Sequence, residues 1–217
     1  MPARKQSLME VDAAAAVERL LRLLAVPGVT GQEEAVARTI ADMLREVGVP
    51  PEAIRFDDAH QRIPEPTPVG NLIVQLPAHL PRRSKSKARG HADPILFATH
   101  MDTVPLCAGA EPKVEGRRVV NVHEGKTALG GDNRTGCAVL VTLAAELIRQ
   151  GLPHPPITLL FTVREESGLY GARYLNPADL GGVVMGFNVD GRNAAELTVG
   201  AIGADRWSVD IYGKAAH

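Results

Sequence analysis

The sequence predicts an α/β protein, a three-layer α/β/α sandwich whose central sheet is mixed and mostly parallel. Four short apolar runs, each bounded by Gly, Pro or charged residues, have the form of buried strands. Segments with apolar side chains at helical spacing lie before and between these runs, and this alternation is typical of layered α/β folds. The 217 residues, 45% of them hydrophobic, are enough to bury a full core.

Two amphipathic helices are expected first. Leucine and valine side chains recur at helical spacing across residues 11–26, and a Pro-Gly pair ends this segment. Thr30 is followed three residues later by Glu33, which is the pattern of a capping box. This pattern predicts a second helix that stops at Gly48.

The strands are expected at the four apolar runs, which span residues 71–76, 94–99, 157–163 and 183–189. Between the second and the third run, residues 133–150 have helical spacing and predict a third helix. Residues 196–212 alternate as strands do, and a further domain is expected to start there.

Composition and charge narrow the function classes. The formal net charge of -1 gives no overall field that would attract nucleic acid or an anionic membrane. Residues 81–91 carry five Lys and Arg but no aromatic side chain to stack on a base, so a solvated hairpin loop is expected. The two cysteines, Cys107 and Cys137, are too few for a disulfide framework. No signal peptide or membrane span is visible, and the expected location is the cytoplasm.

The first chemical motif is Thr-His-Met-Asp-Thr-Val-Pro, which starts where an apolar run ends. In open α/β sheets, ligands bind at such strand ends. Residues two apart lie on one side of an extended segment, so Asp102 can orient the ring of His100 while His100 binds a metal. Taken alone, the pair is also compatible with a surface histidine.

The second motif is Gly-Gly-Asp-Asn-Arg-Thr-Gly, which runs directly into the expected third helix. Its glycines would let the backbone approach a ligand closely. Asp132 could be a plain N-cap, or it could share its two oxygens between two metal ions. Neither the P-loop pattern nor the dinucleotide fingerprint is present, which argues against nucleotide binding.

The third and fourth motifs follow the last two apolar runs. Glu165 and Glu166 are adjacent carboxylates that would repel each other at a buried strand end unless a cation is present. Asp190 follows the fourth run and precedes a glycine, where a turn residue is the simpler interpretation. Metal-ligand side chains thus follow three expected strands and begin one helix, and one metal site explains all of them together.

In this order, with Gly-Lys-Ala-Ala-His at the end, the motifs resemble the co-catalytic two-zinc metallopeptidases that include peptidase T-like tripeptide aminopeptidases. Carboxypeptidase G-type enzymes, aminoacylases and succinyl-diaminopimelate desuccinylases belong to the same superfamily. The resemblance spans about residues 11–217 and is strongest to the peptidase T-like branch. It implies a zinc exopeptidase fold with two zinc ions, and a short peptide as substrate.

The resemblance also implies roles for single residues. His100 and Asp190 would bind one zinc, Glu166 would bind the other, and Asp132 would bridge the two. Asp102 would support His100, and Glu165 would be the general base. A water held between the metals would lose its proton to Glu165 and attack the carbonyl, and the proton would then pass to the leaving amine.

The resemblance extends to the domain boundary. Residues 1–198 would form the N-terminal part of the catalytic domain, and residues 199–217 would begin a lid or dimerisation domain that is cut short. His217 matches a family histidine that reaches the substrate, often across a homodimer. Arg134 stands where the family commonly has Lys. The family completes its second zinc site with a histidine downstream of the lid, which this sequence does not contain.

Three hypotheses follow. The leading one is a metal-dependent hydrolase, a tripeptide aminopeptidase-like enzyme that is active only when the missing region is restored. The second keeps the metals but makes the substrate an N-acyl amino acid, as for a deacylase or desuccinylase, because an amide carbonyl is attacked in both cases. The third is a noncatalytic metal-binding fragment that acts as a binding module.

Overall fold

The computed structural model describes residues 9–79, 92–191, 193–203, 205 and 207–214. Five strands form the central sheet in the order β1-β2-β6-β3-β7. Their bounds are Ile54–Phe56 for β1, Leu72–Leu76 for β2, Ile95–His100 for β3, Ile157–Thr162 for β6 and Met185–Asn188 for β7. The four strands expected from apolar runs are therefore all present, each within two residues of its expected ends.

The direction of the strands determines where the site can form. β3 pairs in parallel with β6 on one side and with β7 on the other, whereas β1 with β2 and β2 with β6 are antiparallel. The mixed sheet is thus confirmed, with two parallel pairings among its four. Because β6, β3 and β7 are parallel neighbours, their carboxyl ends meet at one edge of the sheet.

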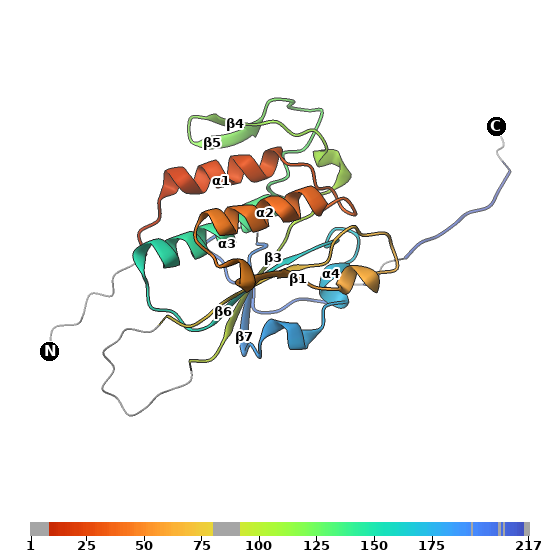
Figure 1. The fold of residues 1–217 in the computed structure, drawn as a ribbon. Helices are drawn as coiled ribbons and strands as arrows, with labels where there is room; N and C mark the ends of the chain where they lie inside the picture. Colours follow the sequence, from red (N-terminus) through yellow and green to blue (C-terminus); the bar gives the residue numbers. More distant parts are fainter. Residues whose placement is uncertain (1–8, 80–91, 192, 204, 206, 215–217) are drawn as a thin grey trace.

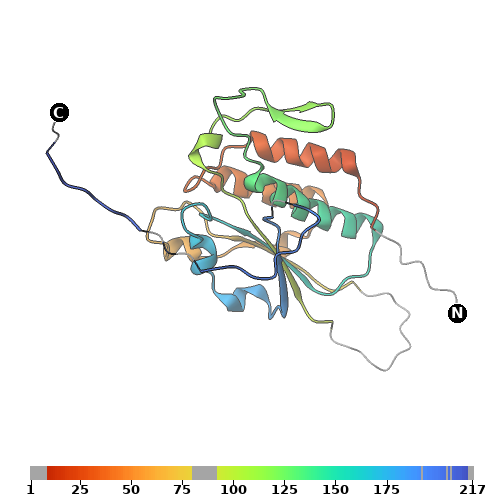
Figure 2. The same ribbon diagram turned by 180° about the vertical axis from the view of Figure 1, so that it is seen from behind.

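Three long helices cover one face of the sheet (Figures 1 and 2). They are α1 (Ala13–Ala25), α2 (Glu34–Glu46) and α3 (Gly131–Gln150). The opposite side of the described structure carries a short 3-10 turn, η4 (Pro177–Leu180), so the third layer is thin in this part of the chain (Figure 2). The predicted α/β class is confirmed.

The core lies between the sheet and these helices. All six residues of β6 are buried, because this strand is central and has helices over one face. Phe161 and Leu159 are fully buried, as are Ile40 of α2 and Leu140 of α3. Burial of each such side chain contributes about 1.5–3 kcal/mol, so this packing fixes the strand ends that carry the polar motifs.

The expected capping box does not form. Glu33 is the N-cap residue of α2, but its side chain makes no capping hydrogen bond. The Thr30 hydroxyl instead donates to Oδ2 of Asp102 at 2.7 Å, and the Glu33 carboxylate accepts from the backbone N–H of Arg164 at 3.1 Å. Both side chains therefore bind the polar edge of the sheet, and Glu33 keeps one local partner, the Gly31 N–H at 2.8 Å.

The remaining elements are short. The helix α4 (Tyr170–Arg173) and a hairpin of β4 (Pro112–Glu115) and β5 (Arg118–Asn121) were not expected from the sequence. Further 3-10 turns are η1 (Pro51–Ala53), η2 (Ala59–Gln61) and η3 (Pro105–Cys107). In the described part of the chain, no helix combines the length and the apolar character that a membrane crossing needs.

Three expectations concern residues 81–91, residues 196–212 and His217. The basic loop at residues 81–91 lies outside the described residues, as does His217. The strands expected at residues 196–212 were wrong for this structure, which assigns no strand to the described residues of that stretch. A strand needs a hydrogen-bonded neighbour, and the described residues of this stretch run away from the body of the molecule (Figure 1).

Candidate metal centre

The polar motifs come together at the carboxyl ends of the three parallel strands. His100 is the last residue of β3, and Asp190 follows β7 by two residues. Glu165 and Glu166 follow β6, and Asp132 is the second residue of α3. The fold therefore brings residues that are up to 90 positions apart in the sequence to one place.

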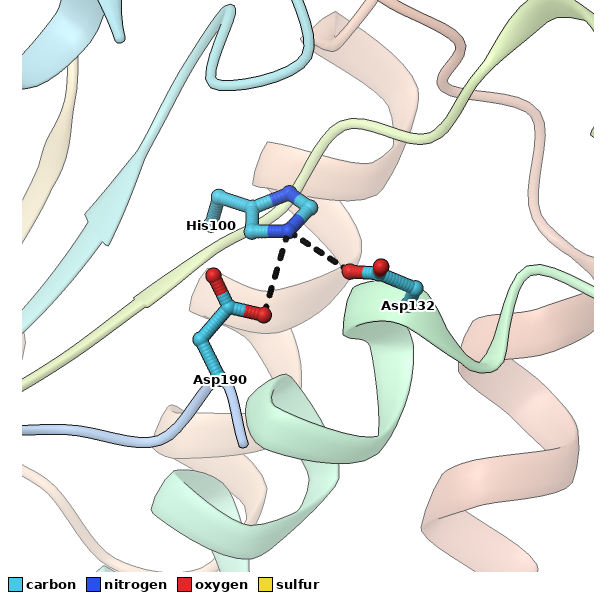
Figure 3. Close-up of side chains that lie close together, drawn as sticks. All are labelled: His100, Asp132 and Asp190. Carbon is cyan, nitrogen blue, oxygen red and sulfur yellow. Dashed lines mark hydrogen bonds and ion pairs between the residues drawn. The ribbon is translucent and has the colours of Figure 1, made fainter. Parts of the chain in front are cut away.

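The Nε2 atom of His100 is the centre of this group. It lies 2.9 Å from Oδ1 of Asp132 and 3.7 Å from Oδ1 of Asp190 (Figure 3). One ligand atom from each of the three residues lies within 4.8 Å of the others. The His100 side chain is 2% exposed and that of Asp190 is 25% exposed, whereas Asp132 is 74% exposed. The group is thus anchored in the core on one side and open on the other.

The two glutamates form a second group with the same histidine. Oε2 of Glu165 lies 3.9 Å from His100 Nε2, and ligand atoms of His100, Glu165 and Glu166 all lie within 4.8 Å of one another. Among the described residues, these two groups share His100, and neither joins Asp132 to Glu166. The bridging role of Asp132 therefore stays a prediction.

The orientation of His100 is fixed mainly by the backbone. Its Nδ1 lies 3.0 Å from the carbonyl oxygen of Asp102 and 3.4 Å from the carboxylate oxygen Oδ1 of the same residue. A proton on Nδ1 satisfies these acceptors, so that Nε2 faces Asp132 and Asp190 and offers its lone pair to a metal only when its own proton has left. Asp102 does lie beside the His100 ring, as predicted, with its carbonyl as the nearer partner.

The Asp102 carboxylate has a second set of partners that sequence reasoning missed. This side chain is fully buried and accepts from Thr30 Oγ1 at 2.7 Å, from the Glu165 N–H at 3.0 Å and from the Glu166 N–H at 3.3 Å. Burial alone would raise the pKa of Asp102, but hydrogen bonds from His100, from this backbone and from Thr30 lower it. Asp102 therefore connects the histidine to both glutamates.

Asn133 connects the helix start to the Asp190 segment, and this role was also missed. Its Nδ2 donates to the Val189 carbonyl at 2.7 Å, and its Oδ1 accepts from the Gly136 N–H at 2.9 Å. A Cβ at Gly136 would lie 2.6 Å from the same carbonyl oxygen and would collide with Thr99 Oγ1. This glycine thus allows a close approach to protein backbone, where the motif had suggested an approach to a ligand.

Arg134 is not directed at the acidic group. It is 2% exposed, and its guanidinium donates to the carbonyls of Leu23 at 3.2 Å and Gly28 at 3.0 Å. Burial lowers its pKa from the usual value. Its hydrogen bonds connect α3 to the end of α1 and to the turn that follows, so its role in this structure is to join these elements.

The carboxylates of the site repel one another, which favours binding of a cation. Burial raises the pKa values of Glu165, Glu166 and Asp190, and the neighbouring carboxylates raise them further, while the nearby His100 lowers them by a smaller amount than burial raises them. Burial lowers the pKa of His100, but Asp102, Asp190 and Glu165 outweigh this effect and raise it to about 9. Five acidic side chains, those of Asp102, Asp132, Glu165, Glu166 and Asp190, surround one imidazole and repel one another, and a divalent metal would relieve that repulsion.

The donor set fits zinc. Imidazole nitrogen and carboxylate oxygen are both common zinc ligands, and bonds of about 2.0 Å in a tetrahedral site place ligand atoms about 3.3 Å apart. The distances of 2.9 and 3.7 Å from His100 Nε2 to the two aspartates lie on either side of that value. The residues present therefore match a metal site without large rearrangement.

Comparison with known proteins agrees with this geometry. Residues 79–216 match the model of peptidase family M28. The chain belongs to peptidase family M28. The match includes every residue of the acidic group and His100, and M28 peptidases are metal-dependent. The predicted class, a metal-dependent hydrolase of the peptidase type, is confirmed at the level of the family.

Among similar proteins, the uncharacterized protein YqjE of Bacillus subtilis (strain 168) is 28% identical over 202 residues, which cover 93% of this M28 chain and 50% of YqjE. Peptidase T of Escherichia coli (strain SE11) is 28% identical over 178 residues, which cover 68% of this chain and 41% of Peptidase T. These relatives confirm the resemblance to peptidase T-like enzymes.

The solved structure of the aminopeptidase PepT from Bacillus cereus ATCC 10987 is similar with a TM-score of 0.72 and 27% identity. The superposition covers 84% of this M28 chain and 44% of PepT. A tripeptidase from Staphylococcus aureus shares the fold, with a TM-score of 0.70 and 24% identity. The superposition covers 83% of this chain and 44% of the tripeptidase. The chain thus spans about half the length of the relatives it matches.

Proposed function

We propose that this chain carries most of the catalytic centre of a zinc-dependent aminopeptidase that removes the N-terminal residue from short peptides. The observation that carries the proposal is the convergence of Asp132, Asp190 and Glu165 on Nε2 of His100, within 3.9 Å in each case. Membership of peptidase family M28 supports the reaction class, and the likeness to Peptidase T and PepT supports short peptides as substrates.

We assign His100 and Asp190 to one zinc ion, Glu166 to a second, and Asp132 to both. The two groups around His100 support this division, because one contains Asp190 and the other contains Glu166. When bound, the metal ions would polarise the scissile carbonyl and lower the pKa of the attacking water. The carboxylates and the imidazole would hold these ions at the exposed side of the strand ends, where Asp132 is 74% exposed and a peptide can approach.

Glu165 is the general base in this proposal. Its side chain is 27% exposed and lies beside His100, and burial with neighbouring carboxylates raises its pKa above the usual value. A raised pKa brings a carboxylate nearer to neutral pH, where it can both accept and donate a proton. Glu165 would accept a proton from the attacking water on a carboxylate oxygen and then donate it to the leaving amine.

We infer that the residues of this chain belong to a larger enzyme. We assign residues 1–198 to the N-terminal part of the catalytic domain and residues 199–217 to the beginning of a lid or dimerisation domain. In support, the relatives are about twice as long as this chain, and apolar side chains such as Trp207 and Ile211 are 86% and 89% exposed. The remaining ligand of the second zinc, the contribution of His217 and a homodimer belong to that larger protein.

Two free cysteines, Cys107 and Cys137, support a cytoplasmic location for the enzyme. Cys137 is buried beside His100, with its sulfur 3.3 Å from the His100 carbonyl oxygen, and burial raises its pKa to about 12. This thiol therefore stays protonated at neutral pH and serves as a small apolar side chain next to the site.

The test is a substrate panel on a version of the protein that includes the region corresponding to the rest of its relatives. Tripeptides, dipeptides and N-acyl amino acids would be compared with zinc present, for the parent and for Glu165→Gln. The aminopeptidase proposal expects tripeptide cleavage that the substitution abolishes. Preferential release of the acyl group would favour a deacylase or desuccinylase, and hydrolysis of none of them would favour a noncatalytic binding fragment.

A further inference from the structure

Three consecutive backbone N–H groups after β6 donate to carboxylates from other parts of the fold. The Arg164 N–H donates to Oε1 of Glu33 at 3.1 Å. The Glu165 and Glu166 N–H groups donate to Oδ1 and Oδ2 of Asp102 at 3.0 and 3.3 Å. The segment that carries both glutamates of the metal centre is therefore held along its backbone by two buried acids.

Glu33 is an unusual residue for its position. It is fully buried, although it stands at the start of a helix where a glutamate is normally solvated. Its Oε1 also accepts from the Gly31 N–H at 2.8 Å, while its buried Oε2 finds no hydrogen-bond partner among the described residues. A buried carboxyl with one unpaired oxygen destabilises a fold, so its contacts with Gly31 and Arg164 must bring a compensating advantage.

The backbone of Arg164 needs this support. Its φ angle is +50°, in the left-handed region that residues other than glycine rarely adopt. Its guanidinium is fixed from the other side by Thr67 Oγ1 at 2.6 Å and by the Glu65 carboxylate at 2.6 Å. The turn lets the chain leave β6 and return Glu165 to 3.9 Å from His100. Contacts to both the backbone and the side chain of Arg164 thus determine where Glu165 lies.

We propose that Glu33 is a positioning residue, which acts with Asp102 to hold the 164–166 backbone so that Glu165 and Glu166 face His100. The proposal rests on the proposed function, in which Glu165 is the base and Glu166 a metal ligand. The hydrogen bonds of Glu33 go to the Gly31 and Arg164 N–H groups and not to the side chain of Glu165 or Glu166. Its effect passes through the Arg164 N–H and the left-handed turn.

The substitution Glu33→Met tests the proposal, because methionine fills a similar volume without an acceptor. Glu146→Met is the matched control, since Glu146 is also a buried glutamate, 1% exposed, and accepts a backbone N–H, that of Asp12, at 3.0 Å. Glu33→Gln is the conservative rescue, because its amide oxygen can accept from the same N–H groups as Oε1. Unfolding in urea would measure the stability loss of each variant.

The first readout is amide hydrogen exchange in the metal-free chain, which does not depend on catalysis. Glu33→Met should speed amide exchange at residues 164–166 by about tenfold or more beyond its effect on the exchange rates of the other amides. Glu146→Met should speed exchange at residues 164–166 only as much as its loss of global stability explains. Glu33→Gln should keep most of the protection. Equal exchange at residues 164–166 in the Met variants, at equal stability, would overturn the proposal.

The second readout is made on the longer, zinc-loaded enzyme. Loss of a supporting partner of a metal ligand typically lowers metal affinity or activity by about 10- to 100-fold. Glu33→Met should therefore lower zinc affinity and kcat by about that factor with a smaller change in KM, and Glu33→Gln should restore most of kcat. A fall in kcat no larger than that of Glu146→Met would contradict a positioning role.

Two further controls keep the outcomes distinct. If Glu33→Met does not fold, Glu33→Asp replaces it, because it keeps the charge but is one methylene shorter and should lose the Arg164 contact. Faster exchange in Glu33→Asp then supports the proposal, and unchanged exchange contradicts it. If Glu165→Gln leaves activity intact, the proposed function fails, and the exchange result still decides whether Glu33 holds the segment.

Discussion

His100 Nδ1 lies closer to the backbone carbonyl of Asp102 than to its carboxylate, at 3.0 Å against 3.4 Å. A backbone acceptor fixes the imidazole whatever the protonation of the Asp102 side chain. The carboxylate is then available to hold the Glu165 and Glu166 N–H groups and the Thr30 hydroxyl. One residue thus orients a metal ligand with its backbone and the base segment with its side chain.

Asp102→Asn should therefore disturb the position of the Glu165 and Glu166 backbone more than the orientation of the His100 ring. The amide can accept from only one of the two backbone N–H groups, so we expect a loss of about 1–3 kcal/mol in the free energy of unfolding. Zinc affinity should fall about 10- to 100-fold, as measured by competition with a chelator. The control is Asp57→Asn, at a buried aspartate that accepts from the Asn71 and Ala59 N–H groups. Equal zinc affinities in the two variants would argue against this role of Asp102.

Metal binding should depend on pH because His100 must lose a proton first. The acidic neighbours outweigh burial and raise its pKa to about 9, so below this pH a zinc ion must displace a proton from the ring. The apparent zinc affinity should rise by up to about tenfold per pH unit between pH 6.5 and 9 and then level off. Isothermal titration at several pH values would check this. A flat profile would contradict it.

The same raised pKa predicts an opposite trend for the metal-free chain. His100 binds its proton more tightly in the folded state, where its pKa is about 9, than in the unfolded state, where it is close to 6.5. This contribution to stability is fully present below the unfolded pKa and is lost as the pH rises through the folded one. Urea unfolding should therefore show a larger fall in stability from pH 6.5 to 9 for the parent than for His100→Ala.

Gly136→Ala should displace the segment that carries Asp190. The new Cβ would meet the Val189 carbonyl oxygen at 2.6 Å and collide with Thr99, and overpacking of this kind costs about 1–3 kcal/mol. Gly131→Ala in the same motif is the control, because its Cβ would meet only Thr135 Oγ1, at an ordinary 3.7 Å. Zinc affinity should fall in the first variant and stay near that of the parent in the second. Similar affinities in both variants would show that the close approach at Gly136 does not matter.

Much of the candidate site follows from sequence because its residues stand directly after apolar runs. His100 stands at the end of a strand and Asp190 just after one, and each apolar run can be recognised from its own residues alone. The pairing of β3 with both β6 and β7 could not be predicted in this way, since strand order depends on contacts between distant segments. That pairing converts separate motifs into one group around His100.

The errors have the same physical origin. Thr30 and Glu33 fit a local capping pattern, but they do not bond to each other's backbone, and their partners Asp102 and Arg164 are 72 and 131 residues away. Short strands such as β1, with three residues, carry too little periodicity to predict. The stretch at residues 196–212 has strand periodicity, but periodicity does not supply a partner strand.

We propose that His100, Asp132 and Asp190 hold a metal ion with Glu165 beside it. Zinc titration of this chain against a competing chelator tests it most directly, with His100→Ala and Asp190→Ala compared with the parent. We predict at least one zinc site, with affinity about 10-fold or more lower in each variant, since each loses a ligand. Zinc binding of the same affinity in the parent and in both variants would contradict the metal centre described here.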